Sequence, residues 1–282
     1  MRPLRVSAIS FLNTAPLMWD FEHEPTPELR ERFAVSYTVP SACAEALRSG
    51  QADIGIVPVI TTASIPGLTV VPDVAIAAVN EVRSILLVSK VPIEQIRTLA
   101  LDTSSRTSVV LVQVLLSKFY GVSPELTSMA PELAPMLAQC DAGLLIGDPA
   151  LLAETGAFHV YDLATLWQQH TGLPFVFAVW AVRKAALAEA GGKVDVAGIF
   201  QRSRDHGTRP ESIEVISREW TARIALTPED IRSYLTRNIY YKLDEPCLAG
   251  LRLYFRYAAE LGLIAAEPRL EFVGERTGVS GV

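Results

Sequence analysis

The chain has 282 residues, half of them hydrophobic, and a formal net charge of −6 at pH 7. This length suits two medium-sized domains, and the hydrophobic content excludes a disordered chain. The negative charge and the lack of a basic block argue against a nucleic-acid-binding surface, so we expect no nucleic-acid partner.

The N-terminal third alternates between predicted strands and helices. We expect strands at residues 5–10, 34–39 and 52–59 and helices at 16–23 and 41–49, with Gly50 at the C-cap of the second helix. Alternation of this kind predicts an α/β layer with a mainly parallel sheet.

The beginning of the chain also bears on where the protein works. Residues 1–9 become polar too soon for a secretory signal, and no apolar stretch is long enough to cross a membrane. We therefore expect a cytoplasmic protein without membrane contact.

Two further apolar runs, 69–79 and 84–89, lead to residues 90–92, where the chain is predicted to leave the first lobe. A strand at 99–101, a polar loop and a helix at 107–120 then repeat the order of the first lobe. An internal repeat supports a duplication: residues 51–57 and 139–145 both read Gln, small, Asp, a small or aliphatic residue, Gly and two aliphatic residues.

The rest of the chain completes this division. Residues 171–180 read as a turn and a buried strand that returns to the first lobe, and 185–263 read mostly as amphipathic helix. Aromatic residues in that tail are expected to pack on the first lobe: Tyr240, Tyr241, Tyr254 and Phe255. We expect two similar, hinged α/β lobes with mainly parallel or mixed sheets, lobe 1 from 1–91 plus 178–282 and lobe 2 from 92–177.

The most informative polar segment is 102–108, Asp-Thr-Ser-Ser-Arg-Thr-Ser, between a short strand and a long helix. The first N–H groups of a helix have no partner within it and face the positive end of its dipole, so hydroxyls and an arginine there predict a carboxylate or phosphate site. Ordinary helix capping is the alternative for the hydroxyls, and a structural ion pair is the alternative for Arg106.

Loops at the carboxyl ends of parallel strands form ligand sites. The loops that follow the first strand of each lobe are residues 10–16 and 104–108, so the two segments are expected to face each other across a cleft.

Cysteine and histidine spacing gives no sign of a metal centre. The three cysteines, at 43, 140 and 247, form no Cys-x-x-Cys pair, and the four histidines share no metal-ligand spacing. We expect no metal.

Several motifs together resemble the chorismate dehydratase family of the futalosine route to menaquinone. They are the segment 10–16, Pro40-Ser41, Gly50, Asp53, Ser84-Ile85-Leu86-Leu87, Asp102, Ser105-Arg106-Thr107-Ser108 and Ile146-Gly147-Asp148-Pro149-Ala150. The resemblance extends from residue 5 to about 180 and is weaker in the tail. It implies a fold like that of type II periplasmic binding proteins, and a lyase that removes water from chorismate without a cofactor, giving 3-[(1-carboxyvinyl)oxy]benzoate.

For such a dicarboxylate substrate, residues 104–108 supply donors. We expect Arg106 or the amides of Thr107 and Ser108 to hold one carboxylate, with Ser105 adding a hydroxyl. Arg83 is a second candidate partner, although strand alternation points it away from the side of Ser84. Ser41 is expected to cap its helix and to touch the ligand.

Asn13 and Ser84 are the candidate catalytic residues on this resemblance. Either can hydrogen-bond the leaving hydroxyl or the developing enolate, whereas the alternatives are a turn or cap for Asn13 and a backbone contact for Ser84. The motifs contain no histidine or glutamate, so we hypothesise that the substrate's own enolpyruvyl carboxylate takes the proton. Asp148 reads as an N-cap before Pro149, and its place at the cleft rim also allows it to accept the chorismate hydroxyl.

Two rival functions stay open. The sister enzyme that forms 1,4-dihydroxy-6-naphthoate usually opens with a Ser-Pro-Cys-Pro-Asn motif, where this chain has Ser-Phe-Leu-Asn-Thr. A non-catalytic binding or sensor protein for an aromatic carboxylate belongs to a different class. The sequence indicates no oligomeric state.

Overall fold

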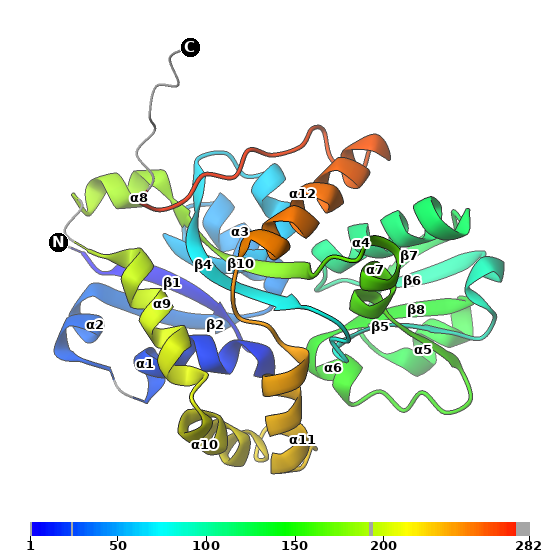
Figure 1. Ribbon diagram of the computed structural model, residues 1–282, viewed down its shortest axis with the longest axis horizontal. Coiled ribbons are helices and arrows are strands. Elements are labelled where there is room, and N and C mark those ends of the chain that lie inside the picture. Colours follow the sequence, from blue (N-terminus) through cyan, green and yellow to red (C-terminus); the bar gives the residue numbers. More distant parts are fainter. Residues whose placement is uncertain (1, 24, 192–193, 275–282) are drawn as a thin grey trace.

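Two mixed five-stranded sheets form the two lobes of the protein (Figure 1). The structure is a computed structural model that describes residues 2–23, 25–191 and 194–274. The strand orders are β2-β1-β3-β10-β4 in the first sheet and β7-β6-β8-β5-β9 in the second.

In the first sheet β1 is parallel to β2 and β3, whereas β10 runs antiparallel between β3 and β4. Nearly every position of β3 and β10 is buried, as expected for central strands covered on both faces. The strands are β1 (Leu4–Ile9), β2 (Phe33–Thr38), β3 (Ile54–Pro58), β4 (Leu68–Ala78) and β10 (Phe175–Arg183), and the helices between them are α1 (Trp19–Glu22), α2 (Pro27–Arg32) and α3 (Pro40–Arg48).

The second sheet repeats this arrangement, with β6 parallel to β7 and β8 and with β5 antiparallel between β8 and β9. Its strands are β5 (Ile85–Ser89), β6 (Thr98–Asp102), β7 (Glu125–Met129), β8 (Ala142–Ile146) and β9 (His159–Asp162). Its helices are α4 (Thr107–Leu115), α5 (Leu133–Gln139), α6 (Gly147–Leu151) and α7 (Leu163–Thr171).

The internal repeat of the sequence has a structural meaning. Asp53 and Asp141 precede the equivalent strands β3 and β8, and each carboxylate accepts a backbone N–H from the start of β1 or β6, from Arg5 at 2.9 Å and from Arg97 at 3.0 Å. Burial alone raises the pKa of Asp53, but hydrogen bonds from Arg5 and Arg2 outweigh it and hold that pKa well below its usual range.

The glycines of the repeat are equivalent as well. A side chain on Gly55 would meet Leu47 of α3 at 3.2 Å, and one on Gly143 would meet Met136 of α5 at 3.1 Å. A helix therefore lies close against the equivalent strand in each lobe. The prediction of two similar lobes is confirmed.

The expected lobe boundaries need correction. The chain leaves the first sheet after Ala78, because β5 pairs with β8 and β9 of the second sheet rather than lying before the crossing. It returns at Phe175, where β10 begins. An apolar strand reads the same in either lobe, and only its partners decide the sheet to which it belongs.

The C-terminal part is helical and packs on both lobes (Figure 1). Tyr240 forms a bridge to Ala77 at the end of β4, whereas the Tyr254 hydroxyl donates to the Thr107 carbonyl at the start of α4. The tail was expected to pack on the first lobe, but it contacts both lobes. Its helices are α8 (Lys184–Glu189), α9 (Val196–Gly207), α10 (Pro210–Trp220), α11 (Pro228–Ser233) and α12 (Glu245–Glu260).

Some predicted helices differ in detail. The first is a 3₁₀ helix over Leu12–Met18 continued by α1, and α4 ends in a π-helical turn over Leu116–Tyr120. Gly50 has a φ of +74° just beyond the C-cap of α3, which is the conformation for which glycine is suited. Among the described residues there is no helix with the length and apolarity that a membrane span requires.

Candidate active site

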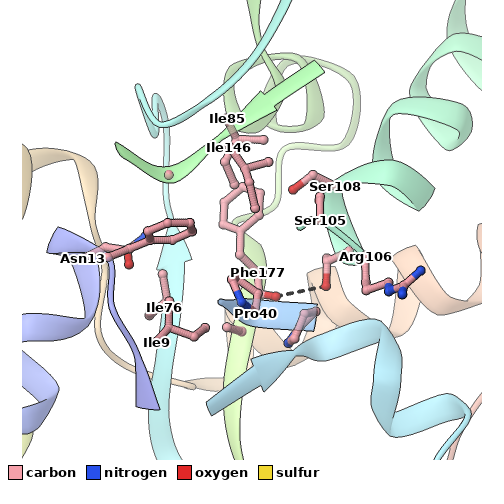
Figure 2. A pocket seen from close by; sticks show the side chains of 15 residues that line it. Ile9, Asn13, Pro40, Ile76, Ile85, Ser105, Arg106, Ser108, Ile146 and Phe177 are labelled. Carbon is pink, nitrogen blue, oxygen red and sulfur yellow. Dashed lines mark hydrogen bonds between the residues drawn. The ribbon is translucent and has the colours of Figure 1, made fainter. Parts of the chain in front are cut away.

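A pocket lies where the loops of the two sheets meet (Figure 2). It contains about 460 Å³ of non-atom space, a volume that includes open solvent. Its lining residues are Ile9, Phe11, Asn13, Pro40, Pro58, Ile76, Ile85, Ser105, Arg106, Thr107, Ser108, Ile146, Gly147, Phe177 and Ala178. The loop after β1 and the loop after β6 both contribute, as the parallel-strand argument predicted.

Figure 2 shows the distribution of polar groups in this pocket. Asn13 lies on one side and Ser105, Arg106 and Ser108 lie on the other, with apolar side chains such as Ile146 between them. Among the described residues that line the pocket there is no carboxylate, histidine or lysine, and Arg106 is the single charged one. The lining suits an apolar ring that carries negative groups.

Hydrogen bonds to the Asp102 carboxylate, rather than a side-chain cap of the helix, hold the segment 102–108 in place. The buried Asp102 carboxylate accepts the backbone N–H of Ser104 at 2.8 Å and its hydroxyl at 2.6 Å, and its other oxygen accepts the Ile146 N–H at 3.3 Å. Arg106 is the N-cap of α4, and no side chain caps that helix. The capping interpretation is therefore wrong, and the amides of the first turn of α4 face the pocket without a side-chain cap.

The four predicted anion ligands in this segment differ in whether their polar side-chain groups are already hydrogen-bonded. Ser105 and Ser108 are buried residues of the pocket lining. The Thr107 hydroxyl is already engaged, because it donates to the Phe177 carbonyl at 3.0 Å and accepts the Ile60 N–H at 3.3 Å. Only the Thr107 backbone amide is left for a ligand.

Arg106 is exposed, and its guanidinium points away from Asn13 in Figure 2. Within residues 2–23, 25–191 and 194–274 it has no ion-pair partner, so the structural ion pair offered as an alternative is not found. Its side chain has to turn toward the cleft to bind a carboxylate.

The loop after β1 meets the second lobe directly. The Leu12 N–H donates to Asp148 Oδ1 at 3.1 Å, which joins the 3₁₀ helix after β1 to α6 after β8. The Phe11 ring lies on Gly147, where a Cβ atom would come within 2.6 Å of it, and Gly147 has a φ of +62°. These two contacts close the cleft beside Asn13.

Asp148 was predicted to be an N-cap, but the N-cap of α6 is Ile146 and Asp148 lies in the first turn. Burial raises the pKa of its carboxyl to about 6, although the Leu12 N–H opposes the shift. Asp148 therefore lies at the cleft as expected, as the acceptor of a contact between the lobes. It does not line the pocket.

Ser84 and Arg83 lie at the crossing between the sheets. Ser84 directly precedes the pocket residue Ile85 and is fully buried, and its carbonyl accepts the Gly147 N–H at 2.7 Å. Arg83 has a φ of +62°, and its N–H donates to Asp162 Oδ2 at 2.6 Å. The strand begins after both residues, so the alternation that was expected to separate them does not apply.

Ser41 does not cap α3, because Val39 is the N-cap and no side chain bonds the first turn. Its neighbour Pro40 lines the pocket, whereas Ser41 does not. Helix α3 begins one residue earlier than predicted because proline suits its first position.

The structure adds one residue that the sequence did not indicate. The Tyr234 hydroxyl donates to Ser84 Oγ at 2.8 Å. Tyr234 begins a π-helical turn, Tyr234–Asn238, in the tail. Helical periodicity marks such a tyrosine only as a core residue, and its partner is far away in the sequence.

In the described part of the chain, no group of three or more His, Cys, Asp or Glu residues is placed to hold a metal ion.

A family model described as menaquinone biosynthesis matches residues 4–260. The chorismate dehydratase of Thermus thermophilus is 32% identical over an alignment of 286 residues, which covers 93% of this chain and 97% of the relative.

Solved structures resemble the whole chain. A protein of Archaeoglobus fulgidus has a TM-score of 0.70 at 16% identity and covers 93% of this chain and 98% of its own. The periplasmic aliphatic sulphonate binding protein of Escherichia coli has a TM-score of 0.61 at 17% identity and covers 95% of each chain. These likenesses show the fold, which is the two-lobed α/β fold of periplasmic binding proteins.

Proposed function

The chain belongs to the menaquinone biosynthesis family, and on that premise we propose that it is a lyase that removes water from chorismate to give 3-[(1-carboxyvinyl)oxy]benzoate. Chorismate carries two carboxylates, a ring hydroxyl and an enolpyruvyl ether on one ring. The observation that supports this substrate best is the pocket lining, which offers apolar walls, hydroxyls, uncapped helix amides and an arginine but no carboxylate of its own.

The reaction requires positioning more than a strong base. The ring carbon that bears the enolpyruvyl ether loses its proton and the neighbouring carbon loses its hydroxyl, so the ring becomes aromatic and the elimination is strongly downhill. The pocket lining offers no carboxylate or histidine as a base. The enolpyruvyl carboxylate of the substrate is then the proton acceptor, and the protein holds it against the C–H bond.

Two side chains are assigned to the departing hydroxyl. Asn13 lines the pocket on the first lobe. Ser84 does not line it, but it directly precedes the lining residue Ile85 at the crossing that leads into β5. Both are hydrogen-bond donors, and donors aimed at the leaving oxygen stabilise the charge that develops on it.

The opposite wall anchors the substrate. Ser105, Ser108 and the first amides of α4 bind one carboxylate, and Arg106 turns inward to pair with it. Arg83, Ser41 and Asp148 lie around the pocket without lining it, so they act on the substrate from a second layer or after a rearrangement.

We further propose that the protein acts in the cytoplasm on this small dicarboxylate and without a cofactor, as its resemblance to the family implies. Cell fractionation with an antibody against the chain tests the location. Recovery of the chain in the periplasmic or membrane fraction contradicts it.

Two rivals remain as outcomes of one experiment. Purified protein is incubated with chorismate, and the product is separated by chromatography and weighed by mass spectrometry. Dehydration gives a product lighter by one water, whereas a receptor binds chorismate and leaves it intact, and the naphthoate-forming sister activity leaves chorismate untouched.

Asn13→Ala provides the internal check on the site. We expect kcat to fall by about 100-fold or more, because one preorganised donor at a developing charge has an effect of that size. Asn80→Ala is the matched control, since Asn80 is exposed and lies outside the pocket lining. Wild-type turnover in the Asn13 variant, or in Ser84→Ala, excludes the assigned role.

A further inference from the structure

The C-terminal segment runs beside the crossing that leads to Ser84. Ala77 and Tyr240 exchange two backbone hydrogen bonds of 2.8 and 2.9 Å, and Asn238 Nδ2 donates to the Glu81 carbonyl at 3.1 Å. Tyr234 completes the series at Ser84 itself. The segment from Tyr234 to Tyr240 therefore fixes the crossing along its length.

The Tyr234 hydroxyl has a partner from a distant part of the chain. It donates to Ser84 Oγ at 2.8 Å. Burial raises the pKa of Tyr234 far above its usual range, although the interaction with Ser84 opposes the shift. The phenol is thus a neutral donor near pH 7.

The direction of this bond determines what Ser84 can do. A hydroxyl has one proton and two lone pairs. Because Ser84 Oγ accepts the phenol proton, the proton of Ser84 is free for another acceptor.

We propose that Tyr234 is a positioning residue for the dehydration, which holds the Ser84 hydroxyl with its free proton directed at the leaving hydroxyl of the substrate. This role rests on the proposed function of the site. Tyr234 does not itself line the pocket, so it acts through Ser84.

The π-helical turn is the local device that places the phenol. The Ile239 N–H bonds the Tyr234 carbonyl at 3.3 Å, a wider turn than in an α-helix, and Asn238 at its end is tied to Glu81. Such turns are rare and occur often at functional sites. Here the turn sets Tyr234 and Asn238 against the same crossing.

Tyr234→Phe tests the role, because it removes one oxygen and keeps the ring. We expect kcat for chorismate to fall roughly 10- to 100-fold, as for a displaced catalytic group, with KM changed less than threefold. Tyr241→Phe is the matched control. Tyr241 is a buried tyrosine directly after this segment, and its hydroxyl has no partner among the described residues, so kcat stays at the wild-type level.

A double-mutant cycle separates positioning from a general loss of structure. If Tyr234 acts through Ser84, Tyr234→Phe reduces kcat less in a Ser84→Ala background than in the wild type. Equal losses in both backgrounds, or a Tyr234→Phe kcat within twofold of wild type, overturn the role. Thermal unfolding of both tyrosine variants checks that they fold alike. If the wild-type protein itself leaves chorismate unchanged, the proposed function fails, which is a different result from wild-type turnover with an unaffected Tyr234 variant.

Discussion

Asp148 is a half-buried carboxyl that accepts a hydrogen bond from a backbone amide of the other lobe. Its pKa is raised from 3.8 to about 6 by burial, and no cation pairs with it in the part of the chain that the structure describes. The folded state therefore binds this proton more tightly than the unfolded state does. The resulting stability is fully present below pH 3.8 and is lost as pH rises through about 6.

Asp148→Asn is expected to remove this dependence. The amide oxygen still accepts the Leu12 N–H and stays neutral, so above pH 7 the variant should be more stable than wild type by up to about 3 kcal/mol. Below pH 4 the advantage should disappear. Urea unfolding at several pH values measures both, with the exposed Glu154→Gln as control. Parallel pH curves for Asp148→Asn and wild type contradict the assignment.

At the scale of the element, two turns meet across the cleft. Gly147 opens α6 with a φ of +62° and lies under the ring of Phe11, the N-cap of the 3₁₀ helix that bears Asn13. A side chain at 147 pushes Phe11 away and moves that helix. The position of Asn13 therefore depends on a glycine in the other lobe.

Gly147→Ala is expected to cost about 1 kcal/mol of stability and also to lower kcat/KM roughly 10- to 100-fold. Gly121→Ala separates the two effects, since Gly121 has a φ of +66° and nothing within 4 Å of an added Cβ atom. It should lose a similar amount of stability and keep full activity. Denaturant unfolding and steady-state kinetics on both variants provide the comparison, and identical behaviour of the two argues against a cross-lobe role for Gly147.

Most elements of the fold could be predicted because the sequence pattern of each strand and helix is contained in a short stretch of the chain. The apolar strands and the repeated Asp-x-Gly segments at 53–55 and 141–143 lie within short windows, and β3 and β8 occupy equivalent places. The sheet to which β5 belongs could not be read, because an apolar run does not reveal its partners. The same holds for the ends of α3 and α6, where a proline or glycine started the helix one residue before the expected cap.

The same distinction holds for the residues of the site: local sequence places some of them, whereas tertiary packing places the others. Asn13 and the residues at 105–108 were found because they follow a first strand, where parallel sheets place ligand loops. Tyr234 was missed because its contact with Ser84 depends on a π-helical turn and on tertiary packing across the molecule. The Thr107 backbone amide was assigned to a ligand, and the structure leaves it open to one, whereas the Thr107 hydroxyl links the carbonyl of Phe177 to the amide of Ile60.

At the scale of the whole molecule, the chain crosses from the first lobe to the second and back, and each crossing leads directly into a strand of the lobe that it enters. The chain passes from β4 to β5 and later returns to β10, so two connections join the sheets, and the tail packs across both. Two contacts join the lobes beside the pocket, that of Leu12 with Asp148 and that of Phe11 with Gly147. We expect these contacts to separate when substrate enters, while the two connections stay in place.

Hydrogen exchange at the Leu12 amide can report this opening. In the free protein we expect it to exchange faster than Ser7 in the middle of β1, because separating the lobes breaks its bond to Asp148 without unfolding either sheet. Product at 100 times its Kd should slow the exchange by about 100-fold if only the closed form binds it. The Arg30 amide bonds within α2, away from the cleft, and should not respond. Exchange at Leu12 as slow as at Ser7, and indifferent to product, would mean that the lobes do not part there and that the substrate enters by another route.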